Sequence, residues 1–261
     1  MPKCTQYSDG APCWPELTVT DLGGAAHFYG EVFGWTFRSL GPKVWDYTMC
    51  LMDDMPVAGL TPPPVGMENC LATWNVYLAT SQVDASAVRV QANNGELVVL
   101  PTDLPGLGRV AMAMDREGAG FGLLQLGKES PPLLYKEIGA MCWNELFARS
   151  SVVADKFYTA LFGYEAEQVG DGVDFDYVLW KVASRPVCGR LRMDGEQPPR
   201  PPHWTSYLTV DDSEAAERRI ERAGGQVLIG TYDMPHGRVA VVADPFGAVF
   251  CLCEHPTENT W

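Results

Sequence analysis

The chain of 261 residues is long enough for one large domain or two small ones, and 46% apolar and 11% aromatic residues suffice for packed cores. The formal net charge of −14 argues against nucleic acid and anionic membrane surfaces as partners. No stretch approaches the roughly 18 apolar residues of a membrane span. The start of the chain shows no apolar run typical of a signal peptide, so we expect a cytoplasmic protein whose eight cysteines are reduced thiols.

The chain begins with two consecutive units of the same plan, each a strand, a helix and further strands. Asp21 is placed to cap the first helix and Gly34 to end it. A stiff, proline-rich linker at 61–66 separates the units. The first unit is predicted to hold a strand at 12–20, a helix at 22–33 and strands near 35–40, at 46–52 and at 56–60. The second is predicted to hold a strand at 74–79, a helix at 82–93 and strands at 96–100, 109–114 and 119–126.

The second half of the chain repeats the first. The stretch Cys13-Trp14-Pro15-Glu16-Leu17 returns 129 residues later as Cys142-Trp143-Asn144-Glu145-Leu146. The same offset, or one of 130, relates Phe28 to Phe157, Tyr47 to Tyr177, Trp74 to Trp204, Arg109 to Arg238 and Asp115 to Asp244. This repeat predicts two domains, at residues 1–130 and 131–261.

A Trp and a carboxylate share one face of the opening strand in each half. Side chains alternate along an extended strand, so Trp14 and Glu16 point the same way, as do Trp143 and Glu145. A strand that only supports a core would carry Val or Leu at such positions. We therefore favour a pocket wall, while a core Trp beside a locally hydrogen-bonded Glu stays open as the simpler interpretation.

These motifs resemble the vicinal oxygen chelate superfamily, which holds glyoxalases, extradiol dioxygenases and bleomycin-resistance proteins. The resemblance is carried by Asp21, Phe28-Tyr29, Phe33-Gly34-Trp35 and the closing strand Asp244-Pro245-Phe246-Gly247-Ala248. The two-domain layout is similar to an actinobacterial subgroup associated with antibiotic biosynthesis. The resemblance implies an α+β fold of tandem duplicated glyoxalase-like domains, each of two βαβββ modules that form a curved mixed sheet around a cavity.

The metal ligands of such relatives are missing at the matching places. Metal-using members carry a His on the opening strand, seven residues before the Asp, and a Glu seven residues after the Asp of the closing turn. The first place here holds Trp14, Trp74, Trp143 and Trp204, and the second holds Gly122 and Cys251. One Cys cannot make a site that needs three or four ligands. The four histidines are also widely spaced, at residues 27, 203, 236 and 255, so we expect no metal and no cofactor.

Replacing ligands with Trp predicts an aromatic cavity in each half that suits a flat, conjugated molecule. The expected lining is Trp14, Tyr47, Trp74 and Gly122 in the first half, and Trp143, Tyr177, Trp204, Cys251 and Cys253 in the second. Gly122 is expected to leave room opposite the Trp residues. We expect only one cavity to bind a ligand, with the other filled by its own Trp side chains.

Glu16 and Glu145 are the predicted catalytic residues, because burial beside Trp raises the pKa of a carboxyl toward neutral pH. Cys251 is a weaker candidate nucleophile, since no His is expected near it. The favoured function is metal-independent acid/base catalysis of cyclisation, isomerisation or dehydration on a bulky aromatic natural-product intermediate. Sequestration of an antibiotic for self-resistance and a metal-dependent glyoxalase or dioxygenase activity stay open as alternatives. The expected partner is a small aromatic molecule of polyketide or antibiotic type, bound by a monomer whose halves pack as a pseudo-dimer.

Overall fold

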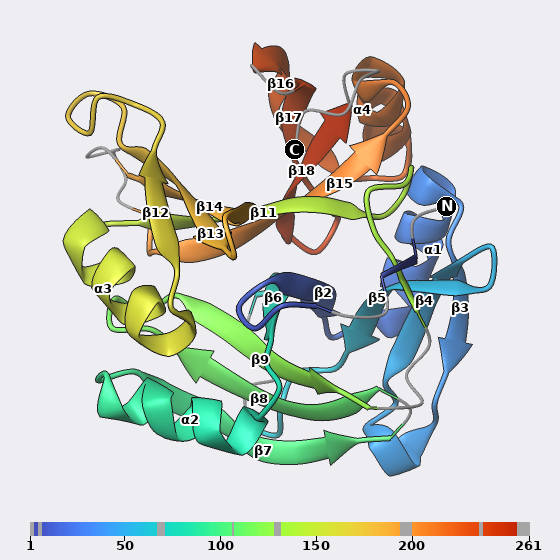
Figure 1. Cartoon of the computed structure of the whole chain (residues 1–261). Coiled ribbons are helices and arrows are strands. Elements are labelled where there is room, and N and C mark those ends of the chain that lie inside the picture. The colour runs from blue at the N-terminus through green and yellow to red at the C-terminus, as the bar shows by residue number, and fades with distance from the viewer. Residues whose placement is uncertain are drawn as a thin grey trace.

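A computed structural model describes residues 3–4, 7–66, 71–105, 107–127, 132–193, 200–234 and 237–254, with the side chains of residues 3, 4 and 43 left aside. Its strands form two eight-stranded mixed sheets, one from each half of the chain (Figure 1). The first half contains β2 (Pro12–Thr18), α1 (Leu22–Phe33), β3 (Thr36–Ser39), η1 (Pro42–Val44), β4 (Thr48–Met52), β5 (Met55–Thr61), β6 (Thr73–Ala79), α2 (Val83–Ala92), β7 (Glu96–Leu104), β8 (Gly108–Met114) and β9 (Gly120–Leu126).

The second half follows the same plan. It contains β11 (Met141–Ala148), α3 (Ser151–Phe162), β12 (Glu165–Gln168), β13 (Tyr177–Val182), β14 (Arg185–Arg192), β15 (His203–Val210), α4 (Ser213–Arg222), β16 (Gln226–Met234), β17 (Gly237–Ala243) and β18 (Val249–Glu254). The short strands β1 (Lys3–Cys4) and β10 (Leu133–Leu134), which come before β2 and β11, pair antiparallel with each other.

Each sheet is built from two βαβββ modules that meet at its centre. In the first sheet the strand order is β3-β4-β5-β2-β6-β9-β8-β7, and in the second it is β12-β13-β14-β11-β15-β18-β17-β16. The opening strands of the two modules pair antiparallel, and each opening strand pairs parallel with the last strand of its own module. The predicted fold class is confirmed. The domain limits at residues 1–130 and 131–261 stay a prediction.

The predicted elements form close to their expected bounds because the local caps are present. The side chain of Asp21 accepts a hydrogen bond from the N–H of Gly24 at 2.8 Å, and Ser150 caps α3 in the same way. Gly34 and Gly163 end their helices with φ of 73° and 72°, a left-handed conformation that suits glycine. One difference is β7, which runs to Leu104 where a turn was expected, because Leu104 pairs with Gly108 in the hairpin to β8.

In the core between the two halves, the first module of each half packs against the second module of the other. Helix α1 packs against α4, and α2 packs against α3. The hydroxyl of Tyr29 on α1 donates to Asp244 Oδ2 of the second half at 2.9 Å, and Tyr158 on α3 donates to Asp115 Oδ2 of the first half at 3.2 Å. The faces of the sheets that carry the helices are therefore buried against each other, which leaves the opposite, concave faces as the candidate sites. No helix in the described ranges is both long and apolar enough to cross a membrane.

Candidate functional site

The concave face of the first sheet holds a hydrogen-bonded network around Glu16. Trp14 and Tyr77 are cross-strand partners on β2 and β6, so their side chains lie on one face with Glu16. The hydroxyl of Tyr77 donates to Glu16 Oε1 at 2.8 Å, and the indole Nε1 of Trp14 donates to the hydroxyl of Tyr47, also at 2.8 Å. The shared orientation of Trp14 and Glu16 expected from strand alternation is present.

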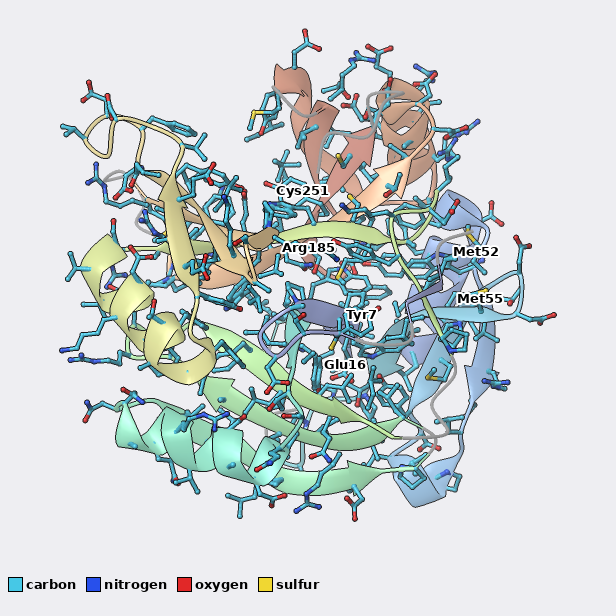
Figure 2. All side chains as sticks on the ribbon, viewed as in Figure 1. Tyr7, Glu16, Met52, Met55, Arg185 and Cys251 are labelled. Carbon is cyan, nitrogen blue, oxygen red and sulfur yellow. The ribbon has the colours of Figure 1, made fainter. Side chains whose placement is uncertain are left out.

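The second sheet repeats this network around Glu145. Tyr207 lies opposite Trp143 across β11 and β15, and its hydroxyl donates to Glu145 Oε1. The indole Nε1 of Trp143 donates to the hydroxyl of Tyr177 at 3.2 Å. Figure 2 shows Glu16 in the first half and Cys251, the cross-strand partner of Tyr207, in the second.

Burial raises the pKa of both carboxyls. The pKa of Glu16 rises from 4.5 to about 7, because loss of water outweighs the hydrogen bonds from Tyr77 and Tyr47. The pKa of Glu145 is also raised by burial, against hydrogen bonds from Tyr207, Tyr177 and Trp143. Glu16 is therefore suited to holding or exchanging a proton near neutral pH, and Glu145 keeps its proton to a higher pH than an ordinary carboxyl.

Trp74 and Trp204 do not face these networks, and their predicted place in the cavities is wrong. Trp74 is paired with Leu17 on the opposite face of the sheet, where its Nε1 donates to the hydroxyl of Tyr29 at 2.9 Å. Trp204 makes the equivalent bond to Tyr158 at 2.9 Å. The cause is the register of the central pair of strands, which places Tyr77 opposite Trp14. Because Trp74 lies three residues from Tyr77, alternation sends it to the other side.

Gly122 does not leave an empty space in the first half, which corrects a second expectation. A Cβ built on Gly122 would lie 2.2 Å from the ring of Tyr77, so the room left by glycine is occupied by that ring. Gly59 and Gly189 play a comparable part, since a Cβ there would lie within 2.0 Å and 2.3 Å of the Tyr47 and Tyr177 hydroxyls. Tyr47, Tyr77 and Tyr177 therefore each approach a glycine backbone closely, whereas Tyr207 lies opposite Cys251.

The first concave face is filled by its own side chains. Trp14, Tyr47 and Tyr77 are buried together with apolar residues from distant segments, namely Val44, Leu104, Leu107, Leu124 and Leu133. Leu133 comes from β10, in the connection between the two sheets. The carboxyl of Glu16 is thus sealed in a core.

The second concave face keeps half-buried and exposed aromatic rings. Where Leu104 is 5% exposed, its counterpart Met234 is 45% exposed. Tyr177 and Tyr207 are half-buried, and Tyr232 is exposed. The pKa of Tyr232 is raised first by partial burial and then by nearby Cys251 and Glu145, which shows that its hydroxyl lies close to both.

Further rings extend this face at its ends. Phe175 stacks on Tyr177 at 5.9 Å between ring centroids, and Phe147 stacks on His203 at 5.0 Å. The connection between β12 and β13, which carries Phe175, lies at one edge of the second sheet, and the strand pair β16–β17, which carries Tyr232, lies at the other. Both rise above β11 in Figure 1. A planar molecule placed against this face would meet aromatic rings from both sides.

Cys251 and Cys253 lie on the second concave face, as their shared orientation on one strand predicts. Burial and the charge of Glu145 raise the pKa of Cys251. This agrees with the expectation that Cys251 is a poor nucleophile.

The donors on the two concave faces do not fit a metal site. Within the described ranges no group of three or more His, Cys, Asp and Glu side chains is arranged to hold a metal ion. His236 and His255 lie outside those ranges. The carboxylates that face inward are instead engaged by tyrosine hydroxyls, as Glu16 is by Tyr77.

Tyr77 and Tyr207 are the residues that sequence reasoning missed. Both were visible as a pair, since Tyr77-Leu78 returns as Tyr207-Leu208 at an offset of 130. What the sequence did not show was the antiparallel register that places each of them beside a Trp and a Glu.

Comparisons with known proteins agree with this architecture. Residues 148–253 match the family model of a glyoxalase-like domain, and residues 13–51 match that of a bleomycin resistance protein-like N-terminal region. The putative glyoxylase CFP32 of Mycobacterium tuberculosis is 34% identical over 258 residues, covering 97% of each chain. The anthracycline biosynthesis proteins DauV of Streptomyces sp. (strain C5) and DnrV of Streptomyces peucetius are 33% and 34% identical over 263 residues, covering 96% of this chain and 95% of theirs.

Solved structures share the fold at lower identity. The Mn(II)-bound glyoxalase from Novosphingobium aromaticivorans superposes with a TM-score of 0.65 at 18% identity, over 95% of this chain and 82% of that one. The 2,3-dioxygenase LapB from Pseudomonas sp. KL28 gives 0.65 at 12% identity, over 98% and 97%.

Proposed function

Since this chain belongs to the glyoxalase-like family of the vicinal oxygen chelate superfamily, we propose that its second half binds a flat aromatic small molecule of polyketide type on the concave face of the second sheet. The observation that carries this proposal is the contrast between the halves. The first concave face is filled by buried side chains, whereas the second keeps accessible rings around Glu145. Aromatic stacking favours a planar guest there.

The relatives support the same class of ligand. Two of them are named as anthracycline biosynthesis proteins, and an anthracycline is a planar aromatic polycycle. A molecule of this kind also offers the phenol and carbonyl groups that a buried carboxyl can recognise by hydrogen bonding.

In this proposal Glu145 is the acid/base group. Its raised pKa lets it accept a proton from an enolisable carbon or hydroxyl and return it elsewhere on the same molecule, as an isomerisation, cyclisation or dehydration requires. Tyr207 holds the carboxyl in place through Oε1. The surrounding Trp143 and Tyr177 keep water away from the exchanging proton.

A second candidate is binding without turnover, as in sequestration of an antibiotic. It is favoured by one observation: the same network of Trp, Tyr and Glu exists around Glu16, where it is sealed and serves packing. A network of this kind is therefore compatible with a purely structural role for Glu145.

The binding part is tested by calorimetric titration with 1,8-dihydroxyanthraquinone. Tyr232→Ala and Phe175→Ala are each expected to weaken binding about 2- to 10-fold, the loss of one aromatic contact. The matched control is Trp45→Ala, which removes the exposed first-half counterpart of Phe175 and is expected to leave the dissociation constant unchanged. Absence of binding, or an equal loss in Trp45→Ala, would contradict the proposal.

The chemical part is tested with aromatic polyketide intermediates followed by liquid chromatography and mass spectrometry. Glu145→Gln keeps an acceptor for Tyr207 but cannot shuttle a proton. It is expected to lower kcat about 100-fold or more while binding changes little. The matched control is Glu16→Gln in the sealed half. If the wild type binds the intermediates tightly but does not convert them, the result favours sequestration.

A further inference from the structure

Beside the aromatic face of the second half lies a cluster of two thiols, a hydroxyl and an amine. Cys253 on β18 pairs with Thr209 on β15, and Cys142 lies in the same buried cluster as Cys253, near enough to affect the pKa of its thiol. The amine of Lys136, in the segment that leads into β11, is near enough to stabilise negative charge on Cys142.

The equivalent place in the first half lacks this group of polar side chains. The backbone there is equivalent, since Gly10 donates to the carbonyl of Ala79 and Gly139 donates to that of Thr209, both at 2.8 Å. The four counterparts of Lys136, Cys142, Thr209 and Cys253 are Tyr7, Cys13, Ala79 and Leu124. They belong to the apolar cluster that fills the first half, where Figure 2 shows Tyr7. Three of the four positions have therefore changed from apolar or aromatic to polar in the second half.

The cluster favours Cys253 as its reactive member. Cys253 is 9% exposed, against 2% for Cys142 and 3% for Cys251, so it is the thiol that a molecule on the concave face reaches first. Hydrogen bonding with the Cys142 thiol, which in the resting structure donates to the carbonyl of Tyr207 at 3.4 Å, lowers the pKa of Cys253, although burial opposes this. The Thr209 hydroxyl has no partner within ordinary hydrogen-bond geometry, and it is also near enough to the Cys142 sulfur to lower the pKa of that thiol.

We infer that Cys253, supported by Cys142, Thr209 and Lys136, is a nucleophilic site that forms a thioether with an electrophilic planar molecule, such as a quinone, held on the concave face of the second sheet. The inference rests on the proposed function for the planar guest, and it adds a covalent fate for guests that carry an unsubstituted quinone carbon.

The step balances without an added oxidant. A bond forms between Cys253 Sγ and a quinone ring carbon, and the electron pair of the attacked carbon–carbon double bond moves to the carbonyl oxygen. That oxygen takes up one proton, which replaces the one lost by the thiol. Tautomerisation then gives the hydroquinone thioether.

The test uses two electrophiles on the full chain with Cys4 and Cys70 replaced by Ser, so that the six cysteines left are all buried thiols. One is 1,4-naphthoquinone, and the other is iodoacetamide, which needs no aromatic site. Intact mass and peptide mapping are expected to find one adduct, at Cys253, with either reagent. Cys142→Ala is expected to slow labelling about 10-fold through loss of a hydrogen-bond donor to the thiolate. The matched control is Cys13→Ala in the first half, which is expected to leave the rate unchanged.

The outcomes separate this inference from the proposed function. First labelling of any other cysteine by both reagents, or of none, overturns the inference, as does labelling of Cys253 by iodoacetamide but not by naphthoquinone. Mapping the first labelled cysteine uses only the protein with Cys4 and Cys70 replaced, so this result does not depend on whether the Cys142 variant folds. Binding of 1,8-dihydroxyanthraquinone, whose quinone carbons are all fused and cannot add a thiol, reports on the proposed function alone.

Discussion

The sealed carboxyl of Glu16 leads to a prediction about pH and stability. Its pKa in the folded protein is about 7, against an ordinary value of 4.5, because burial disfavours the charge. The folded protein therefore keeps this proton over a pH range in which the unfolded chain has released it. The stabilisation is fully present below about pH 4.5 and is lost as the pH rises to about 7.

The size of the effect follows from the same pKa difference. A rise from 4.5 to about 7 corresponds to about 3 kcal/mol, at about 1.4 kcal/mol for each tenfold change in proton affinity. Glu16→Gln cannot ionise and keeps an acceptor for the hydroxyl of Tyr77. The free energy of unfolding of the variant, relative to the wild type, is expected to increase by about 3 kcal/mol between pH 4.5 and pH 8.

The measurement is urea denaturation at a series of pH values, followed by tryptophan fluorescence. Because the wild type and the variant share every other titrating group, their difference isolates Glu16. Glu31→Gln, which removes an exposed carboxylate on α1, controls for the general loss of one charge. A difference that stays flat from pH 4.5 to pH 8 would show that Glu16 is already ionised inside the fold, and the description of a sealed first half would fall.

Two further substitutions test the packing on which the halves depend. Gly122→Ala is expected to destabilise the protein by about 1–3 kcal/mol, since its Cβ would meet the Tyr77 ring at 2.2 Å, whereas Gly120→Ala, with no neighbour within 4 Å, serves as the control in thermal unfolding. Arg190→Leu is expected to cost about 3–5 kcal/mol in urea denaturation, because it removes the guanidinium that lies 2.7 Å from the buried carboxylate of Asp176 and leaves only the longer contact with Arg192 at 3.7 Å. Equal melting temperatures for the two glycine variants, or no loss in Arg190→Leu, would contradict these expectations.

Much of the fold could be predicted from the sequence because its determinants are local. Asp21, Ser150 and the glycines that end α1 and α3 fix helix limits within a few residues of themselves. The repeat at 129 or 130 residues then gave the plan of the second half from that of the first. Strand alternation was enough to place Trp14 beside Glu16.

The candidate site was predicted only in part, because its remaining features depend on distant segments. Trp74 was misplaced since the register between β2 and β6 pairs Trp14 with Tyr77 and Leu17 with Trp74, and no local pattern reveals which residues pair. The filling of the first half depends on Leu133, which comes from beyond its last strand. The cluster that holds Cys142 and Cys253 brings together residues that are more than 100 positions apart in the sequence.

The exchange of contacts between α1 and the second half, and between α3 and the first, has a consequence for how the chain assembles. Tyr29 donates to Asp244, and Tyr158 donates to Asp115, so each copy of the repeat completes its core with residues of the other copy. Two fragments made by cutting the chain at its middle are therefore expected to carry a bare apolar helix layer each and to regain native spectra only when they are mixed. A single copy of the repeat would meet the same need by pairing with a second copy of itself.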